Sequence, residues 1–262
     1  MLTERSQNGG TSDRRSSIQV LARAAEILRA LQAYPSGLTQ TEIGERIGLS
    51  RSTVSRLVLA LEAEGLLSAK GPRGRYRLGP EFIRMAATAR RSSWQELHPL
   101  LIDLSKAIGE TVDLSVLDRD RAVFVDQVIS ENRLQAVSSV GDAFPLHASA
   151  NGKALMASMT ETDVRRITAR SLERFTPNTI VDAEELEREI AEIRATGIAF
   201  DREEHSEGVS AIGLLIGTID HDVLAVSIPM PTHRYEVRKS EILDALSDFA
   251  QSLDQWVANR PR

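Results

Sequence analysis

A pair of closely spaced helix signals in the first third of the chain constrains the fold more than any other feature. Thr39 and Glu42 have the Thr-x-x-Glu spacing of a capping box, which starts a helix, and Gly48 is a residue type that ends one. Ser50 follows almost at once as a second N-cap candidate. The apolar residues after it recur at the spacing of one helix face: Val54, Leu57, Val58 and Leu61. Two short helices joined this tightly predict a helix-turn-helix.

The flanking segments extend this motif into a domain. Before it, apolar residues after Ser17 recur at three and four residues and predict a helix: Val20, Leu21, Ala24, Leu28 and Leu31. After Gly65 the period changes to two around the turn 71–74, which predicts a β-hairpin with arginines at and beyond its tip. We predict a disordered arm over residues 1–16, a winged helix-turn-helix over 17–79 and a linker helix over 80–95.

The charge of the chain is divided unevenly between its two parts. Residues 1–95 carry 15 Lys and Arg against 8 Asp and Glu, a net charge of +7, whereas residues 96–262 carry 17 against 29, a net charge of −12. A basic segment of this size favours a polyanion such as nucleic acid as its partner. The acidic remainder would be repelled by the same partner, so we expect it to form a domain with another role.

The second predicted helix presents residue types that suit the major groove of DNA. If Val54, Leu57 and Leu61 face inward, the helical period turns Ser52, Ser55 and Arg56 outward. Short hydroxyl side chains allow a close approach, and an arginine can bind guanine through two hydrogen bonds. We assign base reading to these three outward residues and phosphate binding to arginines of the helix and hairpin. The predicted DNA contacts are Gln40, Ser50, Arg51, Ser52, Thr53, Ser55, Arg56, Arg73 and Arg75.

Residues 96–262 alternate between helical and strand patterns, which is typical of an α+β domain. Strands are expected at 111–117, 122–129, 133–140, from 198, at 210–219 and at 223–229. Helices are expected at 98–108, at 149–159, after Thr160, after Asp182 and at 235–258. This order predicts an antiparallel sheet with helices to one side.

Several of these segments resemble the IclR family of transcription regulators. In the first part they are 37–39, 43–50, 52–57, 61–65 and 75–79; in the second they are 145–154 (PLHASANGKA), 197–199, Asp201, 203–204 and 208–209. The resemblance covers roughly residues 18–258 in the right order. It implies a GAF-like (profilin-like) effector-binding domain over 96–262, dimers paired through their N-terminal domains, and often tetramers.

A small acid is the effector that these residues favour. Ser149 to Gly152 lie at a predicted helix start, where free backbone N–H groups and the positive end of the helix dipole attract a carboxylate. Ser149 is equally well explained as a simple helix cap. The resemblance implies that the pocket is lined by Ala150, Asn151, Asp201, Val209, Ala211, Ser227 and Pro229.

Two departures from the family change the expected pocket. Ser210 and Ala211 stand where the family often has a cysteine, and Met230 follows Pro229 where a small polar residue is common. Together with the apolar run 214–216, this predicts few polar anchors and a larger, aromatic acid rather than a two- or three-carbon oxoacid.

The sequence argues against an enzyme, a cofactor or a metal site. Glu203, Glu204 and His205, with His147 and His233, could be drawn as a catalytic cluster, but adjacent residues point in different directions, and solvated loop charges explain them better. No nucleotide-binding, hydrolase or metalloprotease motif is present, and the chain has no cysteine. There is no long apolar run and no apolar leader, so we expect a cytoplasmic protein without a membrane span.

The sequence therefore predicts a ligand-gated regulator, more a repressor than an activator, that binds a palindromic DNA operator as a homodimer or homotetramer. Two alternatives stay open. The winged helix could mediate protein contacts or oligomerisation in a ligand-sensing or enzymatic protein. The second domain could instead only oligomerise an architectural DNA-binding protein.

Overall fold

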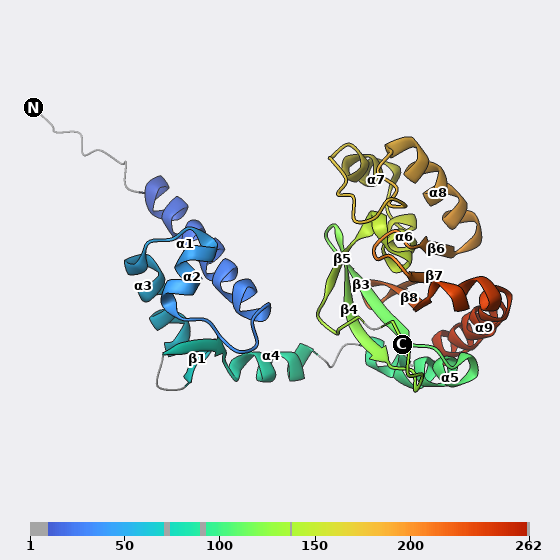
Figure 1. Ribbon diagram of the computed structural model, residues 1–262, viewed down its shortest axis with the longest axis horizontal. Helices are drawn as coiled ribbons and strands as arrows, with labels where there is room; N and C mark the ends of the chain where they lie inside the picture. Colours follow the sequence, from blue (N-terminus) through green and yellow to red (C-terminus); the bar gives the residue numbers. More distant parts are fainter. Residues whose placement is uncertain (1–9, 71–73, 90–92, 137, 261–262) are drawn as a thin grey trace, which may run out of the picture. The chain divides into compact units, whose positions relative to one another are not determined.

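The chain forms two compact units, residues 1–91 and 92–262, in a computed structural model that describes residues 10–70, 74–89, 93–136 and 138–260 (Figure 1). The division falls inside the segment that the sequence predicts as a linker helix. Among the described residues, no helix is both long and apolar enough to cross a membrane.

The first unit has the element order of a winged helix-turn-helix. Its elements are α1 (Gly10–Gln32), α2 (Gln40–Ile47), α3 (Arg51–Ala63), β1 (Leu67–Lys70), β2 (Arg75–Leu78) and α4 (Glu81–Ala89). The backbone N–H of Thr39 donates to Glu42 Oε2 (2.7 Å) and that of Glu42 donates to Thr39 Oγ1 (3.2 Å), so both halves of the capping box form. Gly48 ends α2 at φ 66°, and Ser50 caps α3. The two-helix motif is built by the residues that predict it.

Helix α1 starts earlier than its sequence indicates. It begins at Gly10, so the predicted disordered arm is wrong over residues 10–16, while residues 1–9 lie outside the described part. Extending an existing helix is far easier than starting one, and no proline interrupts this polar stretch. The buried face of α1 also differs from the predicted apolar face. Val20 and Leu21, predicted on that face, are 45% and 71% exposed, whereas Ile27 is fully buried.

The second unit is built on a six-stranded antiparallel sheet in the order β5-β4-β3-β8-β7-β6. The strands are β3 (Val112–Asp118), β4 (Arg121–Val128), β5 (Ala143–Pro145), β6 (Ile198–Arg202), β7 (Val209–Ile219) and β8 (Asp222–Pro231). The helices are η1 (Ser93–Leu97), α5 (His98–Ile108), η2 (Leu146–Ala148), α6 (Ala150–Ala157), α7 (Glu161–Thr168), α8 (Ala183–Thr196) and α9 (Thr232–Ala258).

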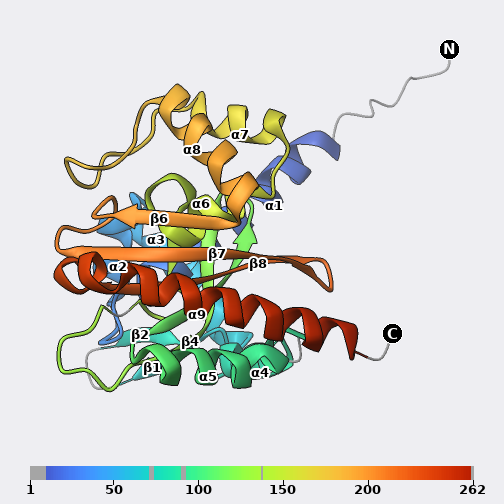
Figure 2. The ribbon, with the colours of Figure 1, turned by 90° about the vertical axis from the view of Figure 1, so that its right-hand side faces the viewer.

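Helices cover both faces of this sheet, so the prediction of helices to one side is wrong (Figure 2). Helices α5 and α9 pack on one face, and α6, α7 and α8 pack on the other. Strand β8 shows why: Leu224 and Val226 join the core under α5 and α9, while Ala225 between them joins the core under α6 to α8. Successive side chains of a strand point to opposite faces, so a strand buried at every position needs cover on both.

The predicted strand at 133–140 is also wrong. The chain there forms no strand in its described residues, and the short β5 pairs instead with the start of β4. Gly141, at φ 98°, turns the chain back so that its N–H donates to the carbonyl of Phe124. Ser138 uses its hydroxyl to bind the carboxylate of Asp113 (2.6 Å), so this segment is held by a side-chain contact rather than by a ladder.

Candidate nucleic-acid interface and ligand cavity

The outward face of α3 carries the residues that the sequence assigns to base reading. Arg51, Ser52 and Arg56 are exposed, and Thr53 and Ser55 are partly exposed. The opposite face is buried in the core of the first unit through Val54, Leu57, Val58 and Leu61. A buried face and a capped N-terminus therefore fix the direction in which the hydroxyl and guanidinium groups point.

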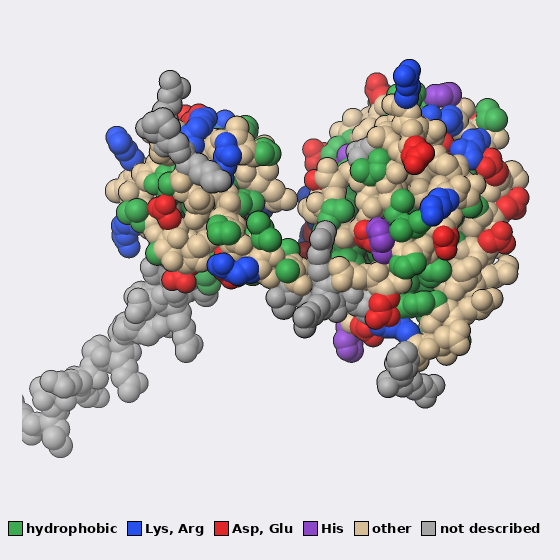
Figure 3. Space-filling view, turned by 90° about the horizontal axis from the view of Figure 1, so that it is seen from below, with side chains coloured by type: hydrophobic (Ala, Val, Ile, Leu, Met, Phe, Trp, Pro, Cys, Tyr) green, Lys and Arg blue, Asp and Glu red, His purple; other side chains and the backbone are tan. Residues whose placement is uncertain are grey.

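The first turn of α3 holds a small cluster of hydroxyl groups. Ser50 Oγ lies 3.2 Å from Ser52 Oγ and 2.9 Å from Thr53 Oγ1, and it accepts the N–H of Thr53. These groups lie at the positive end of the helix dipole, a place that suits a phosphate. In Figure 3, Lys and Arg side chains project at several places from the first unit, whereas Asp and Glu are numerous on the second.

Arg75 is held by the capping box. Its guanidinium forms a two-pronged ion pair with Glu42, Nη2 to Oε1 at 3.1 Å and Nη1 to Oε2 at 3.2 Å, and both side chains stay about one-third exposed. Hydrogen bonds from Thr39, and then the charge of Arg75, lower the pKa of the Glu42 carboxyl. The sequence assigns Arg75 only to phosphate; it does not reveal this link between α2 and the hairpin.

One more predicted DNA contact, Gln40, belongs to the same region. Gln40 Nε2 donates to the hydroxyl of Tyr76 at 3.2 Å, and Leu38 forms an isolated bridge with Tyr76, so the start of α2 is tied to β2. Arg73 lies outside the described residues.

The second unit contains a cavity of about 140 Å³ over the sheet face that carries α6. All seven residues of the expected pocket line it: Ala150, Asn151, Asp201, Val209, Ala211, Ser227 and Pro229. The remaining lining residues are Asp113, Phe124, Ala136, Ser138, Phe144, Ser149, His205 and Ser206. Sheet pairing explains how residues far apart in sequence meet here, because Ala211 pairs with both Asp201 and Pro229.

The start of α6 is pressed closely against the floor of the cavity. A Cβ on Gly213 would lie 2.8 Å from the backbone carbon and oxygen of Ala150, so only glycine allows this approach. Ser149 is the N-cap of α6, with Oγ accepting the N–H of Gly152 at 3.2 Å, and it also lines the cavity. Asn151 is buried and donates to Ser115 Oγ at 3.0 Å. Ser149 therefore both caps α6 and lines the cavity.

Two buried carboxyl groups face the cavity. Burial raises the pKa of Asp113 to about 6, although Ser138 and Gln127 donate hydrogen bonds of 2.6 Å to its oxygens. Burial, reinforced by the charge of Glu204, raises the pKa of Asp201 to about 7. Asp201 Oδ1 accepts the N–H of Glu204 at 2.7 Å. Sequence reasoning missed Asp113, whose available signal was a charged residue within a strand pattern of apolar residues.

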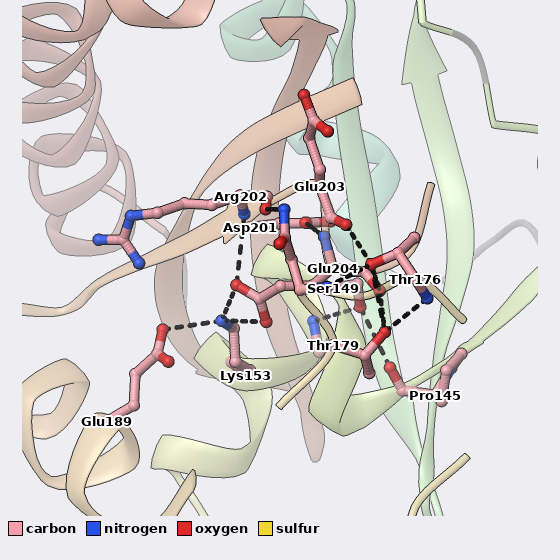
Figure 4. A network of polar contacts seen from close by, with 12 residues as sticks. Pro145, Ser149, Lys153, Thr176, Thr179, Glu189, Asp201, Arg202, Glu203 and Glu204 are labelled. Carbon is pink, nitrogen blue, oxygen red and sulfur yellow. Dashed lines mark hydrogen bonds and ion pairs between the residues drawn. The ribbon is translucent and has the colours of Figure 1, made fainter. Parts of the chain in front are cut away.

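A buried lysine lies beside this site (Figure 4). The side chain of Lys153 is fully buried, and its Nζ lies 2.7 Å from both carboxylate oxygens of Glu204 and 2.7 Å from Glu189 Oε1. Burial raises the pKa of Glu204, while the charge of Lys153 acts in the opposite direction. The hydroxyls of Thr176 and Thr179 donate to the backbone carbonyls of Glu203 and Glu204 at 2.6 Å, which fixes the turn.

The interpretation of Glu203, Glu204, His205, His147 and His233 as solvated charges is therefore wrong for three of them. His147 is buried, and its Nε2 lies 2.8 Å from the carbonyl oxygen of Glu173. Glu204 is 2% exposed because its ion pair with Lys153 compensates for burial. His205 is half-buried and stacks on Phe144 with 4.0 Å between ring centroids. Burial, and then the charge of His147, lower the pKa of His205, which favours a neutral imidazole.

The cavity has aromatic walls that the sequence does not predict, and its accessible lining is mainly apolar. Phe124 packs edge-on against Phe144 at 4.9 Å, and His205 continues the stack. The apolar run 214–216 is not part of the lining, because its side chains pack into the two cores. Among the described lining residues there is no lysine or arginine. No group of His, Asp and Glu in the described ranges is arranged to hold a metal ion.

Comparison with known proteins matches both units. A family model described as the C-terminal part of the bacterial transcriptional regulator IclR matches residues 85–255, and a model of the IclR helix-turn-helix domain matches residues 20–71. The HTH-type transcriptional regulator Rv1719 of Mycobacterium tuberculosis is 50% identical over 243 residues, which cover 93% of this chain and 94% of that protein. The HTH-type transcriptional regulator TtgV of Pseudomonas putida is 34% identical over 240 residues, with 92% of each chain covered.

Solved structures agree with these matches. An IclR transcriptional regulator from Alicyclobacillus acidocaldarius has a TM-score of 0.79 and 28% identity, covering 91% of this chain and 98% of that one. An IclR homologue from Microbacterium hydrocarbonoxydans, solved in complex with 4-hydroxybenzoate, has a TM-score of 0.76 and 23% identity, covering 90% and 98%.

Proposed function

Because the chain belongs to the IclR family of bacterial transcriptional regulators, we propose that it is a cytoplasmic repressor that binds a palindromic operator and changes its operator affinity when the second unit binds a small organic effector. It is a DNA-binding regulator rather than an enzyme, as the names of its relatives indicate. The proposal concerns the repressor role, the contact residues, the effector and the oligomeric state.

The observation that carries the proposal is the outward face of α3. Its hydroxyl cluster and Arg56 stand on a capped helix whose other face is buried, which is the arrangement of a helix that enters the major groove. We assign base contacts to Ser52, Ser55 and Arg56. We assign phosphate contacts to Arg51, Arg73 and Arg75, with Gln40, Ser50 and Thr53 as further contacts near the start of each helix.

A homodimer or homotetramer is supported by the apolar surface of α1. Val20 and Leu21 are exposed within the first unit, and burying them against a second copy removes apolar surface from water. A two-fold dimer places two copies of α3 in major grooves about one helical turn of DNA apart, which explains why the expected operator is palindromic.

A small organic effector is supported by the cavity of the second unit. The seven residues of the expected pocket converge on it, and the start of α6, which lies at the positive end of the helix dipole, supports the predicted carboxylic acid. The Microbacterium neighbour was solved with 4-hydroxybenzoate, so this fold holds a one-ring aromatic molecule in that protein.

Fluorescence anisotropy with DNA from upstream of the protein's own coding sequence tests the DNA role. The full chain is titrated at several salt concentrations, with scrambled competitor. Arg56→Ala is expected to lose about 1–3 kcal/mol of specific binding. Arg51→Ala is expected to weaken binding to all sequences and to lower the salt slope by about one. Arg29→Ala, an exposed residue of α1, is the matched control for loss of one charge in the same unit.

Equal losses of specific and non-specific binding in the Arg56 and Arg51 variants contradict this division of roles. Binding that is indifferent to sequence, both on the upstream DNA and after selection from random sequences, overturns the proposed operator recognition.

A further inference from the structure

We infer that the cavity selects a one-ring aromatic molecule by a hydrogen-bond donor on the ring, a hydroxyl or an amine, that Asp201 accepts. This inference rests on the proposed effector role of the cavity. It adds the group that is recognised, which neither the start of α6 nor the predicted carboxylic acid specifies.

The size and walls of the cavity suit a single ring. Its volume of about 140 Å³ is close to that of engineered apolar cavities of about 150 Å³ that take up benzene. Phe124, Phe144 and the stacked His205 supply flat faces and edges, which favour offset or edge-on contacts with an aromatic ligand. Ala150 and Ala211 leave room over the sheet.

The strongest hydrogen-bonding groups of the lining are acceptors. Above pH 7 Asp201 is mainly ionised, and a carboxylate has about four acceptor positions and no donor. Its Oδ1 accepts the N–H of Glu204 in the network of Figure 4, and the backbone N–H of His205 also donates to this carboxyl, which leaves acceptor positions for a ligand. The bond from Glu204 fixes where the carboxyl group points. Asp113 and Asp201 are separated by three strand spacings, roughly 14 Å across the sheet, so they lie toward opposite ends of the floor.

Among the lining residues that the structure describes, no lysine or arginine can pair with an anionic ligand. The nearest buried cation, Lys153, already contacts Glu204 and Glu189, so this trio carries a net negative charge when its members are ionised. His205 is held toward its neutral form by burial. Above pH 7, where Asp201 is mainly ionised, a donor at Asp201 therefore meets a partner that has spare acceptor positions, whereas a carboxylate at the same place meets repulsion.

Four matched probes separate the donor from the acid group. Phenol and toluene differ in one ring hydroxyl without a carboxylate, and 4-hydroxybenzoate and benzoate differ in the same hydroxyl with one. Binding to the full chain is measured by calorimetry and by thermal stabilisation at pH 8, where the Asp201 carboxyl is mainly ionised. We expect the hydroxyl to tighten binding about tenfold or more within each pair, as a hydrogen bond to a charged group does.

Asp201→Asn tests whether Asp201 is the acceptor. The asparagine keeps an oxygen for the N–H of Glu204 but loses the charge, so the hydroxyl effect should shrink to a few-fold in both pairs. Asp103→Asn, at an exposed position of α5, is the matched control and should keep the full effect.

The inference is overturned by an equal affinity within each pair, by a full hydroxyl effect in Asp201→Asn, or by no binding of any of the four probes. If the carboxylate alone tightens binding, the acid prediction stands and the donor inference fails. Operator binding without ligand is measured separately, so its failure concerns the proposed DNA function and not the cavity.

Discussion

Replacing Asp201 by asparagine should change how the stability of the second unit depends on pH. The carboxyl pKa is about 7 in the folded protein against an ordinary value of 3.8. Between these values the folded protein holds a proton that the unfolded chain has lost, so this contribution favours folding at low pH and disappears as the pH rises through 7. Asparagine does not titrate, and therefore the variant lacks this loss.

The magnitude follows from the pKa. From pH 5 to pH 8 the wild-type protein should lose about 2.5 kcal/mol of unfolding free energy that Asp201→Asn retains, since each unit below the folded pKa corresponds to about 1.4 kcal/mol. For a unit of this size that is about 5–10 °C in Tm between the two proteins. The groups around Asp201 that also titrate or carry charge, Glu204, His205 and Lys153, are common to both proteins.

Urea unfolding at several pH values provides the assay. The two tryptophans of the chain, Trp94 and Trp256, both pack against the core of the second unit, so intrinsic fluorescence reports on that unit. The difference in unfolding free energy between variant and wild type should grow toward high pH, whereas Asp103→Asn should show no such trend. If the unfolding free energies of Asp201→Asn and wild type change in parallel with pH, the argument that folded Asp201 retains a proton up to about pH 7 is refuted.

Three further substitutions should give distinct results in the same assay. Lys153→Met leaves Glu204 buried without its ion pair and should destabilise the second unit by about 3–5 kcal/mol; adding Glu204→Gln should recover part of this loss, and a fully additive double variant would contradict the pairing. Gly213→Ala pushes a methyl group against the backbone of Ala150 and should cost about 1–3 kcal/mol while weakening binding of 4-hydroxybenzoate; an unchanged Tm would show that α6 shifts freely. Tyr235→Phe removes a buried hydroxyl that makes no hydrogen bond of good geometry within the described residues, so stability should be unchanged or rise by up to about 1 kcal/mol, and a clear loss would indicate that the interaction with the neighbouring Arg202 stabilises the fold.

The parts of the fold that the sequence predicts correctly are those fixed by near neighbours. The capping box of Thr39 and Glu42, the glycine end of α2 and the cap at Ser50 each need residues only a few positions apart, and all three form. Boundaries set by helix propagation are less visible, because nothing in the polar stretch before Ser17 marks where α1 begins.

The parts that the sequence could not predict depend on distant partners. Glu204 looks like a solvated charge until Lys153, 51 positions away, is placed beside it. Asp113 becomes a cavity residue only once Ser138 from the β4–β5 connection covers it, and the same contact explains why that connection is not a strand. The seven expected pocket residues were predicted from the family resemblance, whereas Phe124, Phe144 and His205 were identified as lining residues only from the folded structure.

The ion pair between Arg75 and Glu42 has a consequence for the entropy of the proposed phosphate contact of Arg75. Freezing a long, flexible side chain at an interface costs about 0.5–1.5 kcal/mol. The guanidinium of Arg75 is already restrained by two contacts to the Glu42 carboxylate of the capping box, so part of the ordering that the proposed contact requires is complete without DNA. Because the ion pair joins β2 of the wing to α2 of the helix-turn-helix, the charge of Arg75 is preorganised rather than carried by a flexible side chain.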